Sequence, residues 1–210
     1  MVFLCKMQMR RLLHSNGAKG GDWEERRRNQ PQPLGWGYRM GIGDLEEFLF
    51  FCGVKVNVYT DGSARGNPGR GGYGAVLVSG LYKKEMSAGF RLTTNNRMEL
   101  LAVIVAIESM KLPNLDITIY TDSKYVCEAV EKKWVFGWEK KGFKDKKNPD
   151  LWKRFLALYP LHKITFKWIK GHAGHAMNER CDQLATAAAD GGNLAIDDFY
   201  EKEQVANNLL

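Results

Sequence analysis

The segment VYTDGSARGNPGRGGYGAV, Val58–Val76, decides how the fold of this chain is interpreted. An apolar run ends at Asp61, and a stretch rich in Gly, Pro, Asn and Ser follows before apolar residues resume. Such a stretch forms either a phosphate-cradling loop or a turn that presents Asp61 to another group. The segment lacks the Gly-Lys-Ser/Thr ending of a P-loop, so we interpret it as a turn between two strands.

The composition is that of a globular protein with one sizeable core. Of the 210 residues, 44% are hydrophobic and 26% are charged, and no apolar run is long enough to span a bilayer. The net charge of +7 permits a polyanionic partner without demonstrating one. The cysteines show neither CxxC pairing nor grouping with histidines, which is typical of a reducing compartment. They are Cys5, Cys52, Cys127 and Cys181. We therefore expect a soluble, cytoplasmic protein.

The two ends of the chain differ from its middle. Residues 1–53 mix Gly, Pro, Gln and charge without a strand or helix period, so we expect a poorly ordered extension. Its first residues are basic, as in a transit peptide, but the acidic pair Glu24–Glu25 opposes that interpretation. We favour a gene-start artefact, with the working protein beginning near Val54. Residues 191–210 form an acidic tail that we expect to fray.

Residues 54–190 alternate between strand and helix patterns. Strands are predicted at 54–61, 72–80, 82–92, 115–122 and 162–169. Helices are predicted at 93–112, 123–134 and 178–190. The short connections between the first three strands indicate an antiparallel meander. The order predicts a single α/β (α+β) domain, with a mixed sheet and helices on its faces.

Two aspartates follow strands with nearly the same local text, YTDGS at Asp61 and YTDSK at Asp122. Ligands of α/β sheets gather beyond the carboxyl ends of the strands, so we expect these carboxylates to lie side by side. Two close carboxylates repel each other unless they are protonated or bound to a cation. Hard oxygen ligands favour Mg²⁺ or Mn²⁺. A single aspartate after a strand is usually a turn or cap residue, but the repeat favours a metal site.

Two further acids lie on predicted helices. Glu99 is surrounded by apolar residues, and a buried glutamate needs a partner. Asp182 follows Cys181 on the last helix. Either acid could instead lie on an exposed helix face.

Taken together, several blocks resemble type 1 ribonuclease H, the bacterial HI-like class. The resemblance runs in order from about Val54 to Ala189. The blocks are YTDGSARGNPGRGGYGAVL, TTNNRMELLAVIVAIE, YTDSKYV, WVFGWEKKGF, DLWKRF and WIKGHAGHAMNERCDQLA. The resemblance implies a ribonuclease H-like fold, with a five-stranded mixed sheet flanked by helices and a basic helical protrusion.

The resemblance also implies a function. The enzyme would hydrolyse the RNA strand of RNA–DNA hybrids by two-metal-ion catalysis, leaving 5′-phosphate and 3′-hydroxyl ends. The implied catalytic and metal-binding carboxylates are Asp61, Glu99, Asp122 and Asp182, with Asp61 bridging two Mg²⁺ ions and Mn²⁺ as a substitute. His172, on a mobile loop, would transfer protons or assist product release. Without the neighbouring motif, His172 would be read as an ordinary surface histidine.

Selectivity for a hybrid should depend on the 2′-hydroxyls of the RNA. The resemblance implies that Asn67 reads RNA, that Asn95 and Asn96 contact one or both strands, and that Thr94 holds a DNA phosphate. Turn formation and helix capping are the alternative roles of these residues. We also expect the glycines around Asn67 to let the nucleic-acid backbone approach.

Residues 131–154 contain nine basic and four acidic residues with aromatic residues between them, which suits a surface that follows a nucleic-acid strand. The resemblance makes this segment the protrusion that grips the DNA strand. The candidate contacts are Trp134, Trp138, Lys140, Lys141, Lys144, Lys146 and Lys147. The aromatic residues could instead be packing residues, and we expect Trp152 to lie mainly in the core. Glu139 interrupts the basic cluster and should weaken its binding.

Two alternatives remain open: an integrase-like nuclease of the same broad fold, and a non-catalytic module that binds hybrids. The integrase-like class usually carries a helical glutamate as its last acid, where this chain has Asp182. A binding module would not need all four carboxylates. We therefore expect an enzyme that acts on hybrids as a monomer, without a membrane partner.

Overall fold

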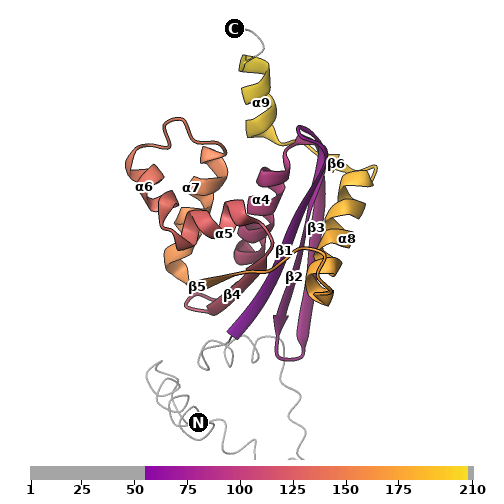
Figure 1. Ribbon diagram of the computed structural model, residues 1–210, viewed down its shortest axis with the longest axis vertical. Coiled ribbons are helices and arrows are strands. Elements are labelled where there is room, and N and C mark those ends of the chain that lie inside the picture. Colours follow the sequence, from indigo (N-terminus) through magenta and orange to yellow (C-terminus); the bar gives the residue numbers. More distant parts are fainter. Residues whose placement is uncertain (1–54, 208–210) are drawn as a thin grey trace, which may run out of the picture. The chain divides into compact units, whose positions relative to one another are not determined.

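The computed structural model describes residues 55–207 (Figure 1). The predicted extension, residues 1–53, and the predicted start at Val54 lie outside the described residues. None of the helices in the described part combines the length and hydrophobicity that a bilayer-spanning segment needs.

The core of the fold is a mixed sheet. Its strands are β1 (Lys55–Gly66), β2 (Gly69–Ser79), β3 (Tyr82–Thr93), β4 (Asp116–Thr121), β5 (Lys163–Trp168) and β6 (Leu194–Ala195). Their order across the sheet is β5-β4-β1-β2-β3-β6. Strands β1, β2 and β3 form the predicted antiparallel meander, whereas β4 pairs in parallel with β1 and with β5. The predicted α/β class with a mixed sheet is confirmed.

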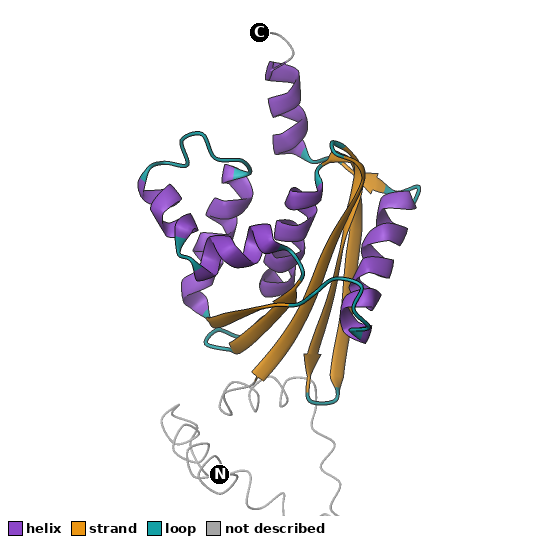
Figure 2. Cartoon of the chain, viewed as in Figure 1, coloured by secondary structure: helices purple, strands orange, loops and turns teal. Residues whose placement is uncertain are grey.

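Helices cover both faces of this sheet (Figure 2). The helices of the described part are α4 (Asn95–Glu108), α5 (Lys124–Glu131), α6 (Trp134–Lys140), α7 (Pro149–Leu158), α8 (Ala176–Asp190) and α9 (Asp198–Asn207), with a 3₁₀ turn, η1 (Tyr159–Leu161). Helix α8 packs on β1, β2 and β3, and α4 packs on the opposite face between the sheet and α7. Because α4 is covered on both sides, it is apolar around most of its circumference, with Leu100 and Ile104 fully buried.

Asp61 does not end its strand, and this part of the prediction is wrong. Strand β1 continues to Gly66 because β2 pairs with it from Asn57 to Gly66, placing Asp61 opposite Gly74. The turn itself is confined to Asn67 and Pro68, between β1 and β2. The glycine-rich segment therefore belongs mainly to two paired strands rather than to a loop.

Two glycines of β2, Gly72 and Gly74, serve helix packing, whereas the approach of a nucleic-acid backbone to the glycines around Asn67 stays a prediction. A Cβ on Gly74 would lie 2.1 Å from the Cys181 carbonyl oxygen, and one on Gly72 would lie 2.5 Å from that of Ala185. Side chains at these positions would push α8 away from the sheet. The glycines thus set the distance between the sheet and the helix that carries Asp182.

The segment after Gly191 is structured through Asn207, and the expectations of a fraying tail and of a five-stranded sheet are wrong. Strand β6 adds a sixth, two-residue strand beside β3. Asp197 then forms an ion pair with the buried Arg97, with Oδ2 2.7 Å from Nε. Arg97 also pairs with Asp150 at 2.8 Å. A buried guanidinium requires such carboxylate partners, so the segment is fastened to the domain.

Candidate active site

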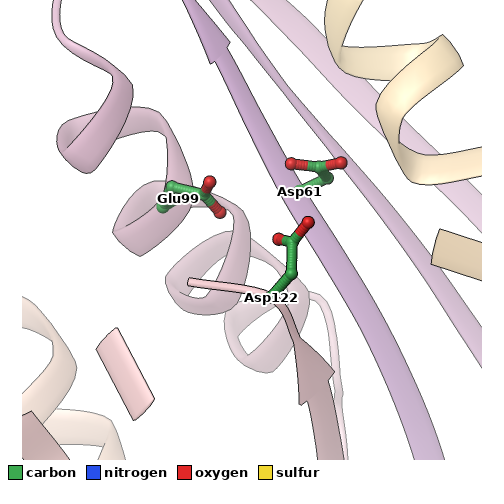
Figure 3. Close-up of side chains that lie close together, drawn as sticks. All are labelled: Asp61, Glu99 and Asp122. Atoms are coloured by element: carbon green, nitrogen blue, oxygen red, sulfur yellow. The ribbon is translucent and has the colours of Figure 1, made fainter. Parts of the chain in front are cut away.

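Three carboxylates from three different elements converge at one side of the sheet. Asp61 lies within β1, Glu99 in α4, and Asp122 directly after β4. Because β1 and β4 pair in parallel with Thr60 opposite Thr121, the residues that follow these threonines are neighbours. One carboxylate oxygen from each acid lies within 4.8 Å of the others. Figure 3 shows the three groups turned toward a common space.

Gly62 brings Glu99 close to β1. A Cβ at residue 62 would lie 2.3 Å from the Glu99 backbone nitrogen and 2.7 Å from the Met98 carbonyl carbon. The helix backbone therefore rests directly on the strand at this point. Glu99 is only 6% exposed as a result.

The cluster is electrostatically strained without a cation. Burial, followed by the charges of Asp122 and Asp182, raises the pKa of Asp61 to about 8, although the Gly62 N–H donates to its Oδ1 at 2.7 Å. Burial and the charge of Asp61 raise the pKa of Glu99 well above its usual range. Glu99 Oε2 is buried and has no hydrogen-bond partner among residues 55–207. Hard oxygen ligands with excess negative charge and an unsatisfied atom fit a divalent cation such as Mg²⁺.

The fourth predicted carboxylate and the predicted histidine lie outside this group of three. Asp182 is half-buried on α8, and its charge is one of the causes that raise the pKa of Asp61. His172 is exposed in the loop between β5 and α8, with a left-handed φ of 51°. Their roles in metal binding and catalysis stay predictions.

The predicted substrate-contacting residues of the turn and of α4 lie near one another. The backbone N–H of Asn95 donates to Asn67 Oδ1 at 3.3 Å, which joins the β1–β2 turn to the start of α4. Asn67 and Asn96 are exposed. Thr94 is the N-cap residue of α4, yet its hydroxyl makes no capping bond. Helix capping by its hydroxyl is therefore not the role of Thr94 in this structure.

Asn95 also contacts the carboxylate cluster, a role that the sequence analysis missed. Its Nδ2 donates to Glu99 Oε1 at 3.3 Å. The spacing of four residues on one helix was the available signal, since such pairs lie on the same face.

The basic protrusion comprises α6, residues 141–148 and the start of α7. All five of its candidate lysines are exposed: Lys140, Lys141, Lys144, Lys146 and Lys147. The protrusion is anchored by Val135 and Phe143, which are buried. Glu139 is exposed among the lysines.

The tryptophans of this region divide between surface and core. Trp152 is fully buried, as predicted. Trp138 packs edge-on against it with a centroid distance of 5.8 Å, and Lys146 Nζ lies 5.6 Å from the Trp138 ring centroid. Trp134 is 46% exposed, with Lys132 Nζ 4.9 Å from its centroid. Trp134 is thus the more accessible of the two predicted contact residues.

Asp122 has supporting neighbours that the sequence analysis also missed. Trp168 Nε1 donates to the Asp122 backbone carbonyl at 3.0 Å, and Asn178 Nδ2 donates to its Oδ2 at 3.4 Å. Asn178 precedes Asp182 by four residues on α8, so the helical spacing could have indicated it.

The fold and the cluster define the class of this protein: an α/β enzyme with grouped carboxylates of the kind that hold divalent cations in nucleases. A family model described as RNase H matches residues 54–190. The ribonuclease H of Desulforamulus reducens is 53% identical over 148 residues, which cover 68% of this chain and 92% of that protein. The ribonuclease H of Rippkaea orientalis is 48% identical over 156 residues, covering 72% of this chain and 95% of that protein.

A solved structure agrees with these relatives. The crystal structure of LC9-RNase H1, described as a type 1 RNase H with the type 2 active-site motif, matches with a TM-score of 0.61 and 31% identity. The match covers 67% of this chain and 74% of that chain. The chain belongs to the ribonuclease H family.

Proposed function

We propose that this chain is a metal-dependent endoribonuclease that hydrolyses the RNA strand of RNA–DNA hybrids and leaves 5′-phosphate and 3′-hydroxyl ends. The observation that carries the proposal is the convergence of Asp61, Glu99 and Asp122 within 4.8 Å, in a chain of the ribonuclease H family. A module that only binds hybrids would gain nothing from burying mutually repelling carboxylates, since that arrangement costs stability.

The proposed metal site consists of Asp61, Glu99, Asp122 and Asp182. Bound there, two Mg²⁺ ions, or Mn²⁺ in their place, would neutralise charge on the scissile phosphate and activate the attacking water. The oxygen donors of this proposed site would come from β1, α4, the end of β4 and α8. Asp61 is proposed as the member that both ions share; burial, and then the charges of Asp122 and Asp182, raise its pKa.

His172 is proposed to move protons during the reaction or to assist product release. Its side chain is exposed, and Gly171 and Gly174 lie on either side of it in the loop. Glycines on both sides allow the loop to change conformation while β5 and α8 stay in place. An imidazole ring carries two nitrogens, through which it can accept and donate protons.

Two surfaces are proposed to hold the hybrid. Asn67, Asn95 and Asn96 offer amide groups suited to 2′-hydroxyls and bases of the RNA. Thr94 and the protrusion, with Trp134, Trp138 and the five lysines, offer hydroxyl, aromatic and cationic groups suited to the DNA strand. RNA discrimination would then depend on the asparagines, and affinity on the lysines.

We further propose that the protein acts as a monomer in the cytoplasm. Cys127 and Cys181 are buried free thiols, which is consistent with a reducing compartment.

A comparison of three nucleic-acid substrates tests this function. Labelled RNA–DNA hybrid, duplex DNA and single-stranded RNA are incubated with the protein and Mg²⁺, and the product ends are identified by their sensitivity to phosphatase and polynucleotide kinase. We expect cleavage of RNA in the hybrid alone, with 5′-phosphate ends. Cleavage of duplex DNA would favour an integrase-like nuclease instead, and tight hybrid binding without cleavage would reject the enzyme.

A further inference from the structure

Asn178 is a buried amide beside the carboxylate cluster, and one of its polar atoms is unused. It lies in the first turn of α8 and is 3% exposed. Its Nδ2 donates to Asp122 Oδ2 at 3.4 Å, whereas its Oδ1 is buried and has no hydrogen-bond partner in the described part of the chain. Buried amide oxygens are rarely left without a partner, so this atom calls for an explanation.

Asp122 is enclosed on the side that faces Asn178. A Cβ on Gly171 would lie 2.4 Å from Asp122 Oδ2, so the backbone of the 171–174 loop passes directly over this oxygen. The Trp168 indole N–H holds the Asp122 backbone carbonyl at 3.0 Å. Among the described residues, Asn178 is the one whose side chain donates a hydrogen bond to the Asp122 carboxylate.

The chemistry of an amide suits this position. A carboxylate here would add a further negative charge next to Asp61, Glu99 and Asp122, whereas a lysine would compete with a divalent cation for them. A neutral amide donates to Asp122 without changing the charge of the cluster. The opposite amide orientation would set Oδ1 against the Asp122 carboxylate, where two acceptors repel each other, so the donor must face Asp122.

We propose that Asn178 is a positioning residue for metal binding. It donates to Asp122 Oδ2 and thereby keeps the other Asp122 oxygen directed toward Asp61 and Glu99, while its own Oδ1 accepts a hydrogen bond from water in the loaded site. The inference rests on the proposed function, in which Asp122 is a metal ligand. Residues that orient metal ligands typically change metal affinity by about 10–100-fold when they are removed.

The test measures Mg²⁺ binding without substrate, by isothermal titration calorimetry on the full chain. We expect Asn178→Ala to raise the Mg²⁺ dissociation constant by about tenfold. At saturating Mg²⁺, its Michaelis constant for the hybrid should stay within about twofold of wild type, because Asn178 is not proposed to touch the substrate. Glu179→Gln, an exposed neighbour on the same helix, is the matched control and should bind Mg²⁺ like wild type.

A second variant separates hydrogen-bond donation from packing. Asn178→Leu has nearly the same size and no charge, but its side chain cannot donate to Asp122. We expect it to bind Mg²⁺ at least as weakly as Asn178→Ala, with circular dichroism and a cooperative thermal transition confirming the fold. Mg²⁺ affinity at the wild-type level in either folded variant would overturn the proposal. If Asn178→Ala does not fold, Asn178→Leu alone decides.

The outcome is distinguishable from a failure of the proposed function. If wild-type protein binds Mg²⁺ but leaves every hybrid uncleaved, the proposed function fails while the Mg²⁺ titration still tests Asn178. If wild type cleaves hybrid and the Asn178 variants keep its Mg²⁺ affinity, only the positioning role fails.

Discussion

Gly62 of β1 lies against the backbone of Glu99 in α4, so closely that a Cβ on residue 62 would fall 2.3 Å from the Glu99 nitrogen. This contact involves backbone on both sides, which leaves no flexible side chain to move aside. The contact holds α4 against the strand that carries Asp61, and Asp61 and Glu99 are both members of the carboxylate cluster.

Gly62→Ala is therefore predicted to separate α4 from β1. We expect a loss of about 1–3 kcal/mol in the free energy of unfolding, the usual cost of overpacking, and a fall in kcat of at least about tenfold because Glu99 moves relative to Asp61. Urea denaturation and hybrid-cleavage kinetics measure the two effects. Gly192→Ala is the control, because a Cβ there meets no atom of the described residues within 4 Å. Wild-type kinetics in a folded Gly62→Ala protein would contradict this account of the cluster.

The raised pKa of Asp61 predicts how the metal-free protein responds to pH. With a folded-state pKa of about 8 against an ordinary value of 3.8, folded Asp61 keeps its proton between these values while unfolded Asp61 has lost it. Stability in EDTA should therefore fall as the pH rises from about 4 to 8. The stability that this proton contributes is gone above pH 8.

Asp61→Asn removes this titration. In EDTA at pH 8, we expect the variant to be more stable than wild type by on the order of 2 kcal/mol, measured by urea denaturation. At pH 4 the two proteins should differ far less, which provides the internal control. Mg²⁺ should raise the stability of wild type at pH 8 but not that of the variant. A variant that is less stable than wild type in EDTA at pH 8 would contradict the pKa assignment.

The basic protrusion is predicted to supply affinity rather than catalysis. Replacing Lys140, Lys141, Lys144, Lys146 and Lys147 with Ala should raise the Michaelis constant for the hybrid by about tenfold or more at moderate salt. The dependence of that constant on salt concentration should become shallower, while kcat stays near wild type. Lys84→Ala, which removes an exposed lysine from β3, is the control. An unchanged Michaelis constant and salt dependence would remove the protrusion from the substrate-binding surface.

The pair of Arg97 and Asp197 is predicted to fasten the C-terminal segment to the domain. Asp197→Ala leaves the buried Arg97 with one carboxylate fewer, and breaking such a pair costs about 3–5 kcal/mol. Glu201→Gln, which weakens the more exposed pair with Arg91, should cost less than about 1 kcal/mol. Equal effects of the two substitutions in urea denaturation would show that Asp197 has no special structural role.

The sequence predicted those features that depend on local pattern. The alternation of apolar residues located the meander, and the unbroken apolar helix identified Glu99 as an acid that needs a partner. The repeated YTD text located Asp61 and Asp122 correctly as neighbours, although Asp61 lies within its strand.

The remaining features depend on contacts between distant residues. The glycines of β2 are typical of a loop in the sequence, and only the packing of α8 on them explains their place in a strand. In the sequence, Asp197 is one acid of an acidic tail. Its structural role depends on Arg97, a buried residue far earlier in the chain. The contact of Asn178 with Asp122 likewise joins two elements whose proximity no local pattern specifies.

The most direct test of the carboxylate cluster as a metal-dependent active site is a single cleavage experiment. End-labelled RNA in an RNA–DNA hybrid is incubated with wild type or Asp61→Asn, in Mg²⁺ or in EDTA. We predict cleavage by wild type in Mg²⁺ and a loss of cleavage both in EDTA and in the variant. Undiminished cleavage by a folded Asp61→Asn protein, or by wild type in EDTA, would contradict the account.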